Sequence, residues 1–352
     1  MIDQPPPSPG SPVNDPVRFL ELGLQLAAGK TGGLARALAE RALARHGDDP
    51  LWQALAAEVL RCEVPDYHVR MLRDGMRNTA YRAAIERFAP GRVVLDIGTG
   101  SGLLAMMAAR AGAAQVYACE ANAMLAAAAR AVIAANGLAD RITVFDRHST
   151  ALDRIRDLGG GVDLVVSEVF CATLIGEGVL GTLTHAREEL AQPGALFLPE
   201  RASIIAALAD IPLPAKSVGP VEGYDLGAFA PHLHAARHCL PEHPALALRS
   251  APAELFAFDF AKGALPPTGQ AETQLTSTGG QVSGLAQWLR LTFAKDIAYE
   301  NRPGSAPDLH WVIGLAPCPP HDAAPGARFR AGAAYAADTL ALWCAPEGDP
   351  LA

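Results

Sequence analysis

The most constraining feature of this sequence is a glycine-rich turn between a short apolar segment and a helix-forming segment. The turn, Gly98-Thr99-Gly100-Ser101-Gly102, follows the apolar residues 93–97 and precedes residues 103–111. Glycines permit positive φ angles and let a ligand approach the backbone closely. The order strand, glycine-rich turn, helix is typical of the nucleotide-binding edge of a doubly wound parallel sheet. We therefore expect a ligand site at the carboxyl end of this first strand.

Strand and helix patterns alternate along the middle of the chain. Short apolar strands are expected at residues 93–97, 115–119, 141–145, 163–167 and 195–198. Helical patterns lie between them at residues 103–111, 123–135 and 180–190. This alternation predicts the α/β class, with a doubly wound Rossmann-like domain over residues 63–200.

The helical rhythm is lost after Glu200, and the remaining apolar segments are short. They are expected to be strands at residues 203–207, 255–260, 285–293, 311–316 and 340–344. Such strands predict a mostly antiparallel second domain over residues 201–352. A polar stretch at about residues 210–244 is too long for an ordinary connection, which indicates a functional or interaction arm.

The N-terminal part has a different composition. Residues 1–16 contain six prolines and are expected to form a flexible tail. Residues 17–62 carry helical patterns that predict two or three short helices. One part resembles a single tetratricopeptide-type repeat, but one copy cannot build a solenoid. We interpret this extension as a helical cap or a partner-binding surface.

Charge and cysteine spacing exclude several classes of protein. The 352 residues include 29 Lys plus Arg and 37 Asp plus Glu, a net charge of -8, which argues against a nucleic-acid-binding surface. The six cysteines are scattered and form no C-x-x-C pair, so neither a disulfide framework nor a metal site is expected. No secretory signal and no apolar run of membrane-spanning length is found. The sequence thus predicts a cytoplasmic protein without membrane or nucleic-acid partners.

A carboxylate completes the candidate ligand site. Glu120 lies 22 positions after Gly98, at the end of the second strand, where a carboxylate can accept both hydroxyls of a ribose. The alternative is a structural glycine turn with a surface glutamate. The glycine spacing is G-x-G-x-G, whereas dinucleotide sites have G-x-G-x-x-G, which favours S-adenosylmethionine over NAD.

Residues 94–102 together with Glu120 resemble the motif of class I S-adenosylmethionine-dependent methyltransferases. The resemblance implies that the methionine portion of the cofactor lies over Gly98 and Gly100. It also implies that Asp96 lies near the amino group of that portion or orients the turn. His148, after the third strand, would contact adenine or serve a structural role.

Two glutamates follow the fourth strand. Glu168 and Glu177 are nine positions apart in the segment 167–178, at the sheet edge where ligands bind in such folds. A loop that folds back can bring both carboxylates onto one planar cation, and a guanidinium offers a matching fork of donors. The alternative is a pair of solvated loop glutamates.

The segment 167–178 resembles the double-glutamate loop of protein arginine N-methyltransferases, and its sequence Leu174-Ile175-Gly176-Glu177-Gly178 is nearest the type III, monomethylating branch. Residues 67–77 resemble that family's N-terminal helix. Leu309-His310-Trp311 resembles its Thr-His-Trp loop, with Leu in place of Thr. Residues 223–225 resemble part of its dimerisation arm. The resemblance covers about residues 65–345.

This family resemblance implies specific roles and partners. His68 and Met71 would line the cofactor pocket, and Arg77 would pair with the methionine carboxylate. His310 would face the substrate with support from Asp74, either as a proton exit route or as a structural contact. The resemblance also implies a β-barrel second domain, a homodimer and an arginine-containing protein or peptide substrate.

The sequence therefore predicts methyl transfer from S-adenosylmethionine to a guanidinium nitrogen held by Glu168 and Glu177. Two alternatives remain. One is a methyltransferase for a small guanidino or amine compound. The other is a non-catalytic adapter that recruits partners through its N-terminal helices, although the presence of Glu120, Glu168 and Glu177 argues against it.

Overall fold

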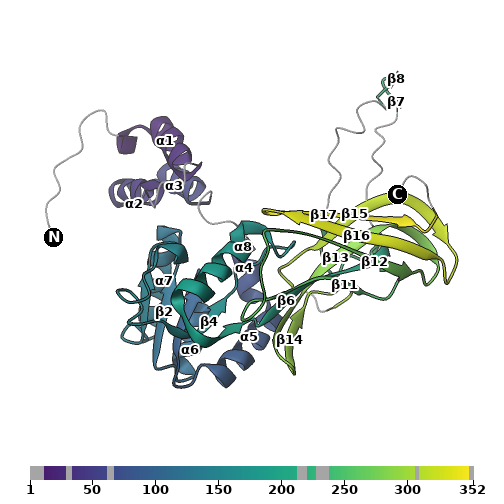
Figure 1. Cartoon of the computed structure of the whole chain (residues 1–352). Helices are drawn as coiled ribbons and strands as arrows, with labels where there is room; N and C mark the ends of the chain where they lie inside the picture. Colours follow the sequence, from purple (N-terminus) through teal and green to yellow (C-terminus); the bar gives the residue numbers. More distant parts are fainter. Residues whose placement is uncertain are drawn as a thin grey trace.

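The computed structural model describes residues 12–28, 34–61, 67–211, 220–226, 238–305 and 309–348. Figure 1 shows a group of N-terminal helices, an α/β domain that contains a parallel sheet, and antiparallel strands on the far side of that domain. The helices are α1 (Pro16–Ala28), α2 (Leu34–His46), α3 (Pro50–Arg61), α4 (Tyr67–Arg73), α5 (Gly75–Phe88), α6 (Leu103–Arg110), α7 (Ala123–Ala135) and α8 (Val179–His185).

The parallel sheet has the strand order β3-β2-β1-β4-β5. Its strands are β1 (Val93–Ile97), β2 (Gln115–Cys119), β3 (Ile142–Phe145), β4 (Val162–Ser167) and β5 (Ala191–Leu198). The central strand β1 pairs with β2 on one side and β4 on the other, so that Leu95 lies between Tyr117 and Val165. The order of the strands reverses at β1 and β4, which is where ligands bind in open α/β sheets. The predicted doubly wound α/β domain is confirmed.

Burial on both faces explains why these short strands form. Leu95 and Leu164 are fully buried, because helices cover the sheet on each side. Local caps fix where the helices begin. The side chain of Asn122 accepts hydrogen bonds from the first turn of α7, and Asp74 accepts one from the Arg77 amide at the start of α5. These caps also place polar side chains beside the carboxyl edge of the sheet.

The second domain is antiparallel, as the sequence predicts. Its larger sheet has the order β10-β6-β13-β15-β9, with β11 paired to β6 and β14 paired to β13, and its smaller sheet has the order β12-β16-β17. The strands are β6 (Arg201–Asp210), β9 (His238–Cys239), β10 (Ala247–Leu248), β11 (Ala253–Asp259), β12 (Thr268–Thr276), β13 (Gly280–Ala294), β14 (Ile297–Glu300), β15 (Ile313–Ala323), β16 (Arg328–Ala336) and β17 (Thr339–Pro346). Among the described strands, these pairings form two separate sheets, apart from a short hairpin within residues 220–226, and they do not close into one barrel.

Strands β12, β14 and β16 are absent from the sequence-based expectation. β12 shows the reason, because its sequence is mostly polar and only Leu275 on it is buried. Its position in the sheet is fixed by its ladder with β16, from Thr268 opposite Ala336 to Thr276 opposite Arg328. An apolar pattern cannot reveal a strand that is held mainly by backbone pairing.

The N-terminal extension forms three helices around a small core of its own, which includes Phe19, Trp52 and Val59. The expected flexible tail to residue 16 is wrong at its end. Residues 12–14 form a 3₁₀ turn, Val13 is 2% exposed, and its carbonyl lies 2.9 Å from Nε2 of His46. The proline-rich composition gave no sign of this contact between Val13 and His46, because the two residues are more than thirty positions apart. None of the described helices is long and apolar enough to cross a membrane.

The predicted arm is described only in part. Residues 220–226 contain the hairpin β7 (Pro220–Val221) and β8 (Tyr224–Asp225), which stands away from the two antiparallel sheets (Figure 1). Tyr224 on this hairpin is 72% exposed. Residues 212–219 and 227–237 of the expected arm lie outside the described residues.

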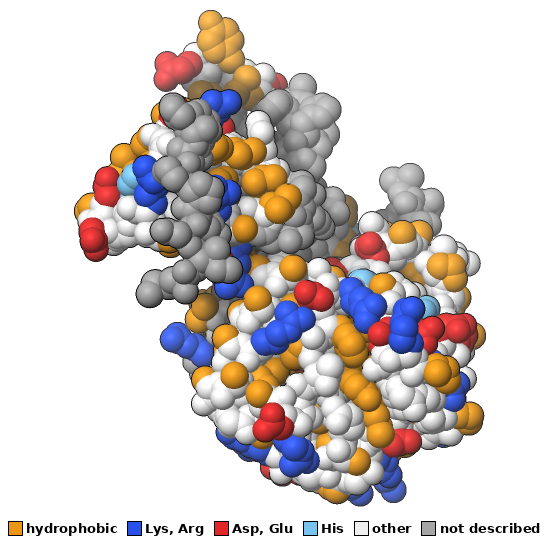
Figure 2. Space-filling view, turned by 90° about the vertical axis from the view of Figure 1, so that its left-hand side faces the viewer, with side chains coloured by type: hydrophobic (Ala, Val, Ile, Leu, Met, Phe, Trp, Pro, Cys, Tyr) orange, Lys and Arg blue, Asp and Glu red, His pale blue; other side chains and the backbone are white. Residues whose placement is uncertain are grey.

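The described residues show the following distribution of charges, thiols and possible metal ligands. In Figure 2, basic and acidic side chains are interspersed over the face that is visible. The five cysteines in the described ranges are free thiols. Within the same ranges, no group of three or more His, Cys, Asp or Glu side chains is arranged to hold a metal ion.

Candidate functional site

The glycine-rich turn lies between β1 and α6 and has the conformation that its glycines permit. Gly98, Gly100 and Gly102 all have positive φ angles, of 71°, 54° and 82°. A Cβ atom on Gly98 would lie 2.5 Å from Cγ1 of Val169, the residue after Glu168. Position 98 therefore requires glycine both for its backbone angle and for space, and it brings the turn against the loop that follows β4.

Asp96 lies beneath this turn and is 1% exposed. One of its oxygens, Oδ2, accepts hydrogen bonds from Oγ1 of Thr99 at 2.5 Å and from the Ala105 amide at 3.1 Å. The other oxygen, Oδ1, is buried without a partner among the described residues. Burial raises the pKa of Asp96 to about 6, although both hydrogen bonds oppose this shift. An unpaired buried acceptor at this place suits a cationic or donor group of a ligand.

Glu120 is held at the neighbouring strand end. Its Oε2 accepts the Gly100 amide at 3.0 Å, and its Oε1 accepts the Asn122 amide at 2.9 Å. The structure thus brings Asp96, the glycine turn and Glu120 together at one edge of the sheet. These residues fit a nucleoside-type cofactor, because they combine a glycine cradle with a fixed carboxylate.

The structure gives less information on three other residues that were expected at the cofactor. His148 is exposed and caps the 3₁₀ turn Ser149–Ala151, with its Nδ1 2.8 Å from Oγ1 of Thr150. Met71 is half-buried in α4. The side chain of His68, also in α4, lies outside the described residues.

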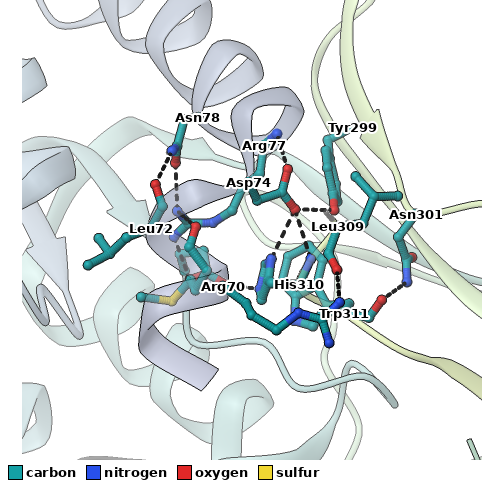
Figure 3. A network of polar contacts seen from close by, with 12 residues as sticks. Arg70, Leu72, Asp74, Arg77, Asn78, Tyr299, Asn301, Leu309, His310 and Trp311 are labelled. Carbon is teal, nitrogen blue, oxygen red and sulfur yellow. Dashed lines mark hydrogen bonds and ion pairs between the residues drawn. The ribbon is translucent and has the colours of Figure 1, made fainter. Parts of the chain in front are cut away.

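Asp74, at the junction of α4 and α5, is the centre of a buried network (Figure 3). Its Oδ1 accepts the Arg77 amide at 2.9 Å, and its Oδ2 accepts the hydroxyl of Tyr299 at 2.7 Å. Both the backbone amide and Nδ1 of His310 also lie near Oδ2, at 3.2 and 3.1 Å. Burial disfavours the charged carboxylate, but these donors outweigh it and lower the pKa of Asp74.

Glu168 lies at the end of β4 and its side chain is 5% exposed. Its Oε2 pairs with Nη2 of Arg77 at 2.5 Å, and its Oε1 lies 3.8 Å from Nε2 of His310. Burial raises the pKa of Glu168, the charges of Arg77 and His310 oppose the shift, and the charge of Glu177 adds to it. Arg77 was expected to hold the cofactor carboxylate, whereas here it pairs with Glu168 and keeps its buried Nε without a partner.

Glu177 lies apart from this buried group. Its side chain is exposed, and its backbone has a φ angle of 61°, which is uncommon outside glycine. The charge of Glu177 adds to the raised pKa of Glu168. The structure therefore provides one buried and one exposed carboxylate at the carboxyl edge of the sheet.

Several residues that support the site were missed by the sequence analysis. Tyr299 on β14 binds Asp74, and Asn301, fully buried, donates to the Trp311 carbonyl at 3.2 Å. The ring nitrogen of Trp311 donates to the Phe170 carbonyl at 2.9 Å, and Arg70 donates to the Leu309 carbonyl at 2.9 Å. No local motif marks Tyr299 or Asn301, whose partners lie far along the chain or in an irregular loop. Arg70 and Trp311 lie within segments that the family resemblance covers, but their contacts with Leu309 and Phe170 were not predicted.

Comparisons with known proteins agree with this geometry. A family model described as "Ribosomal protein L11 methyltransferase (PrmA)" matches residues 82–196. An "Arginine N(omega)-methyltransferase" from Streptomyces achromogenes subsp. streptozoticus is 43% identical over 270 residues, which are 74% of this chain and 73% of that relative. The chain belongs to the protein arginine N-methyltransferase family. It is an S-adenosylmethionine-dependent methyltransferase.

Further relatives of this family are more distant or longer. "Protein arginine N-methyltransferase 7" from Drosophila melanogaster is 37% identical over 224 residues, or 55% of this chain, and the match spans only about a third (32%) of that relative. A Trypanosoma brucei PRMT1 enzyme-prozyme complex with AdoHcy superposes with a TM-score of 0.70 at 23% identity, over 82% of this chain and 95% of that chain. Arabidopsis thaliana protein arginine methyltransferase 10 gives 0.63 at 19% identity, over 79% and 96%. The two structures show a shared fold.

Proposed function

We propose that this methyltransferase modifies a guanidinium nitrogen of arginine and binds the guanidinium through Glu168 and Glu177. The observation that carries the proposal is the buried carboxylate of Glu168 beside the glycine-rich turn. Arg77 already pairs with Oε2 of Glu168, so a substrate guanidinium would bind through Oε1, the oxygen that lies 3.8 Å from Nε2 of His310. The planar guanidinium is the side chain whose donors best match carboxylate oxygens. The exposed Glu177 supplies a second carboxylate on the solvent side.

The cofactor supplies the methyl group when it is bound. Asp96, with its unpaired Oδ1, would hold the amino group of the methionine portion, and Glu120 would hold the ribose. Arg77 pairs with Glu168, and its charge also acts on Asp96 beneath the glycine turn. Its Nε has no partner among the described residues. Through this position, Arg77 can offer donors to the cofactor carboxylate and still compensate the charge of Glu168.

The two glutamates act on the substrate by orientation and electrostatics. A guanidinium has a pKa above about 12, so it enters the site as a cation. Carboxylates on two of its nitrogens keep the third nitrogen pointed at the methyl group, and such positioning supplies roughly 7–11 kcal/mol in favourable cases. Their negative charge also stabilises the positive charge that the guanidinium carries through the reaction.

His310 is the candidate acceptor for the proton that the guanidinium must release. With Nδ1–H donating to Asp74, the lone pair of the ring is on Nε2, which lies 3.8 Å from Glu168. Asp74 would thereby fix the tautomer and direction of the ring. In this scheme His310 takes the proton after it passes the Glu168 carboxylate.

A second candidate function has support from one finding. The Streptomyces relative is named for arginine without the word protein, and this chain is 43% identical to it over 270 residues. A free amino acid would use the same two glutamates. Arginine in a protein remains the first candidate substrate, with monomethylation as the proposed product and the segment 210–244 as the proposed homodimer arm.

The decisive experiment measures methyl transfer from labelled S-adenosylmethionine to two probes, free L-arginine and a peptide with one arginine between glycines. Glu168→Gln and Glu177→Gln are each expected to reduce kcat/KM by about 100-fold or more, since each removes a charge placed on the reacting cation. Glu177→Gln should leave the cofactor dissociation constant unchanged. Glu188→Gln, an exposed glutamate in the described ranges, is the matched control. Retention of full activity by Glu177→Gln would disprove the two-carboxylate arrangement.

A further inference from the structure

The backbone on both sides of Glu177 is held by side chains. The Gly176 amide donates to Sγ of Cys171 at 3.2 Å. The Gly178 amide donates to Oδ1 of Asp338 at 3.0 Å. The Gly178 amide belongs to the peptide that follows Glu177, and the Gly176 amide belongs to the peptide on the other side of Gly176. The short segment around Glu177 is thus held on both sides, although the side chain of Glu177 is exposed.

Such support matters because the backbone at Glu177 is strained. A non-glycine residue with a φ angle of 61° is disfavoured by contact of its Cβ atom with the backbone, and it persists only where the surroundings impose it. The same φ angle decides where the Cα–Cβ bond of Glu177 points. Holding the following peptide through the Gly178 amide, and Gly176 through its own amide, restricts the backbone at Glu177 and thereby the direction in which its carboxylate leaves the backbone.

Cys171 acts from within the loop. Its Sγ accepts the Gly176 amide and lies 3.0 Å from Oγ1 of Thr173, while its carbonyl accepts the Leu174 amide at 2.8 Å. A Cβ atom on Gly176 would lie 2.4 Å from this sulfur. The thiol is thus packed directly against the glycine that precedes Glu177, which leaves no room for another residue type.

Asp338 acts from the second domain. It lies in the turn between β16 and β17, next to Ala337, whose φ angle is 49°. Its carboxylate reaches the loop after β4 from a place 160 positions later in the chain. The turn of the smaller antiparallel sheet thereby fixes the start of α8 and the residue just before it.

We propose that Cys171 and Asp338 are positioning residues that set the direction of the Glu177 carboxylate. This inference rests on the proposed role of Glu177 in binding the guanidinium. Neither side chain needs to touch the substrate, since each acts through one backbone amide. The antiparallel domain then contributes to the geometry of the guanidinium site through Asp338.

The test compares Asp338→Ala, Asp338→Asn and Cys171→Ala with the wild-type protein. Asp338→Ala and Cys171→Ala are each expected to weaken binding of the arginine peptide by about 3- to 10-fold, the effect of one lost hydrogen bond. The dissociation constant, measured by calorimetry with S-adenosylhomocysteine present, reports this effect, and cofactor affinity should not change. Asp338→Asn should bind like the wild type, because an amide oxygen also accepts the Gly178 amide. Asp322→Ala, an exposed carboxylate on β15, is the control.

A double-mutant cycle separates positioning from other roles. In a Glu177→Gln background, Asp338→Ala is expected to have little further effect on peptide binding, because its influence passes through Glu177. If Asp338→Asn binds as poorly as Asp338→Ala, the charge of Asp338 attracts the substrate directly and the inference is wrong. Wild-type binding by Asp338→Ala also overturns it, while leaving the proposed function intact. Unchanged activity of Glu177→Gln instead overturns the proposed function.

Discussion

The proposed cofactor side and the proposed guanidinium side of the site are built in different ways. On the cofactor side, Asp96, Gly98, Gly100 and Glu120 all come from residues 96–120, and their contacts lie within one strand, turn and helix unit and the next strand. On the guanidinium side, the described contacts join α5, the loop after β4, β14 and the β16–β17 turn. The first half can form as a local motif, whereas the second half requires the two domains to be assembled.

This difference predicts that the guanidinium side is the more sensitive to loss of a single partner. Arg77→Ala would leave the Glu168 carboxylate buried without its ion pair. We expect the free energy of unfolding to fall by about 3–5 kcal/mol, the typical cost of breaking a buried pair. Urea denaturation of the purified protein measures this change.

The same helix offers a matched control for that measurement. Arg87 pairs with Asp296 at 2.7 Å, but their side chains are 50% and 68% exposed. Arg87→Ala should therefore cost at most about 1 kcal/mol. Equal losses of unfolding free energy for Arg77→Ala and Arg87→Ala would show that burial of the Arg77–Glu168 pair does not increase the cost of breaking it.

A substitution in the glycine turn tests whether this turn packs against the loop that carries Glu168. Gly98→Ala should lower the free energy of unfolding by about 2–4 kcal/mol, through its positive φ angle and the contact with Val169. Gly91→Ala has a similar φ angle of 73° with open space around it, so it should show the backbone cost alone. Adding Val169→Ala should recover part of the loss at position 98. If Val169→Ala recovers no stability in the Gly98→Ala background, the glycine turn and the loop after β4 are not closely packed at this point.

The smallest expected effect concerns Asp96 and pH. Its pKa is raised from 3.8 to about 6 in the folded state, so its contribution to stability is complete below pH 3.8 and is lost as the pH rises through 6. Asp96→Asn removes this dependence. The free energy of unfolding of the variant, relative to that of the wild type, should therefore rise by roughly 1–3 kcal/mol as the pH is raised from 4 to 7. A difference that stays constant over this range would mean that Asp96 titrates normally.

The sequence predicted that Asp96, the glycine turn and Glu120 lie together, which the structure shows, but it did not predict the surroundings of Glu168 and Glu177. The glycine turn and Glu120 could be recognised because spacing along the chain fixes their place in a parallel sheet. Glu168 and Glu177 were recognisable as a pair, but not the burial of one and the exposure of the other. That difference arises from Arg77 and His310, which approach Glu168 from distant segments.

The residues that support the loop were the hardest to foresee. Tyr299 belongs to a four-residue strand, and Asp338 lies in an exposed turn, so neither carries a periodic or motif signal. Their importance comes from single contacts across more than 150 positions, with Asp74 and Gly178. Such contacts depend on how the antiparallel domain packs against the α/β domain, and no local sequence pattern predicts that packing.

The three N-terminal helices complete their own small core around Phe19 and Trp52, and Arg36 reaches the rest of the protein through a hydrogen bond to the Met124 carbonyl at 3.4 Å. An appendage built in this way can be gained, lost or exchanged as a block during evolution. Replacing these helices as a unit would not expose the core of either of the other two domains, because their apolar side chains pack mainly on one another.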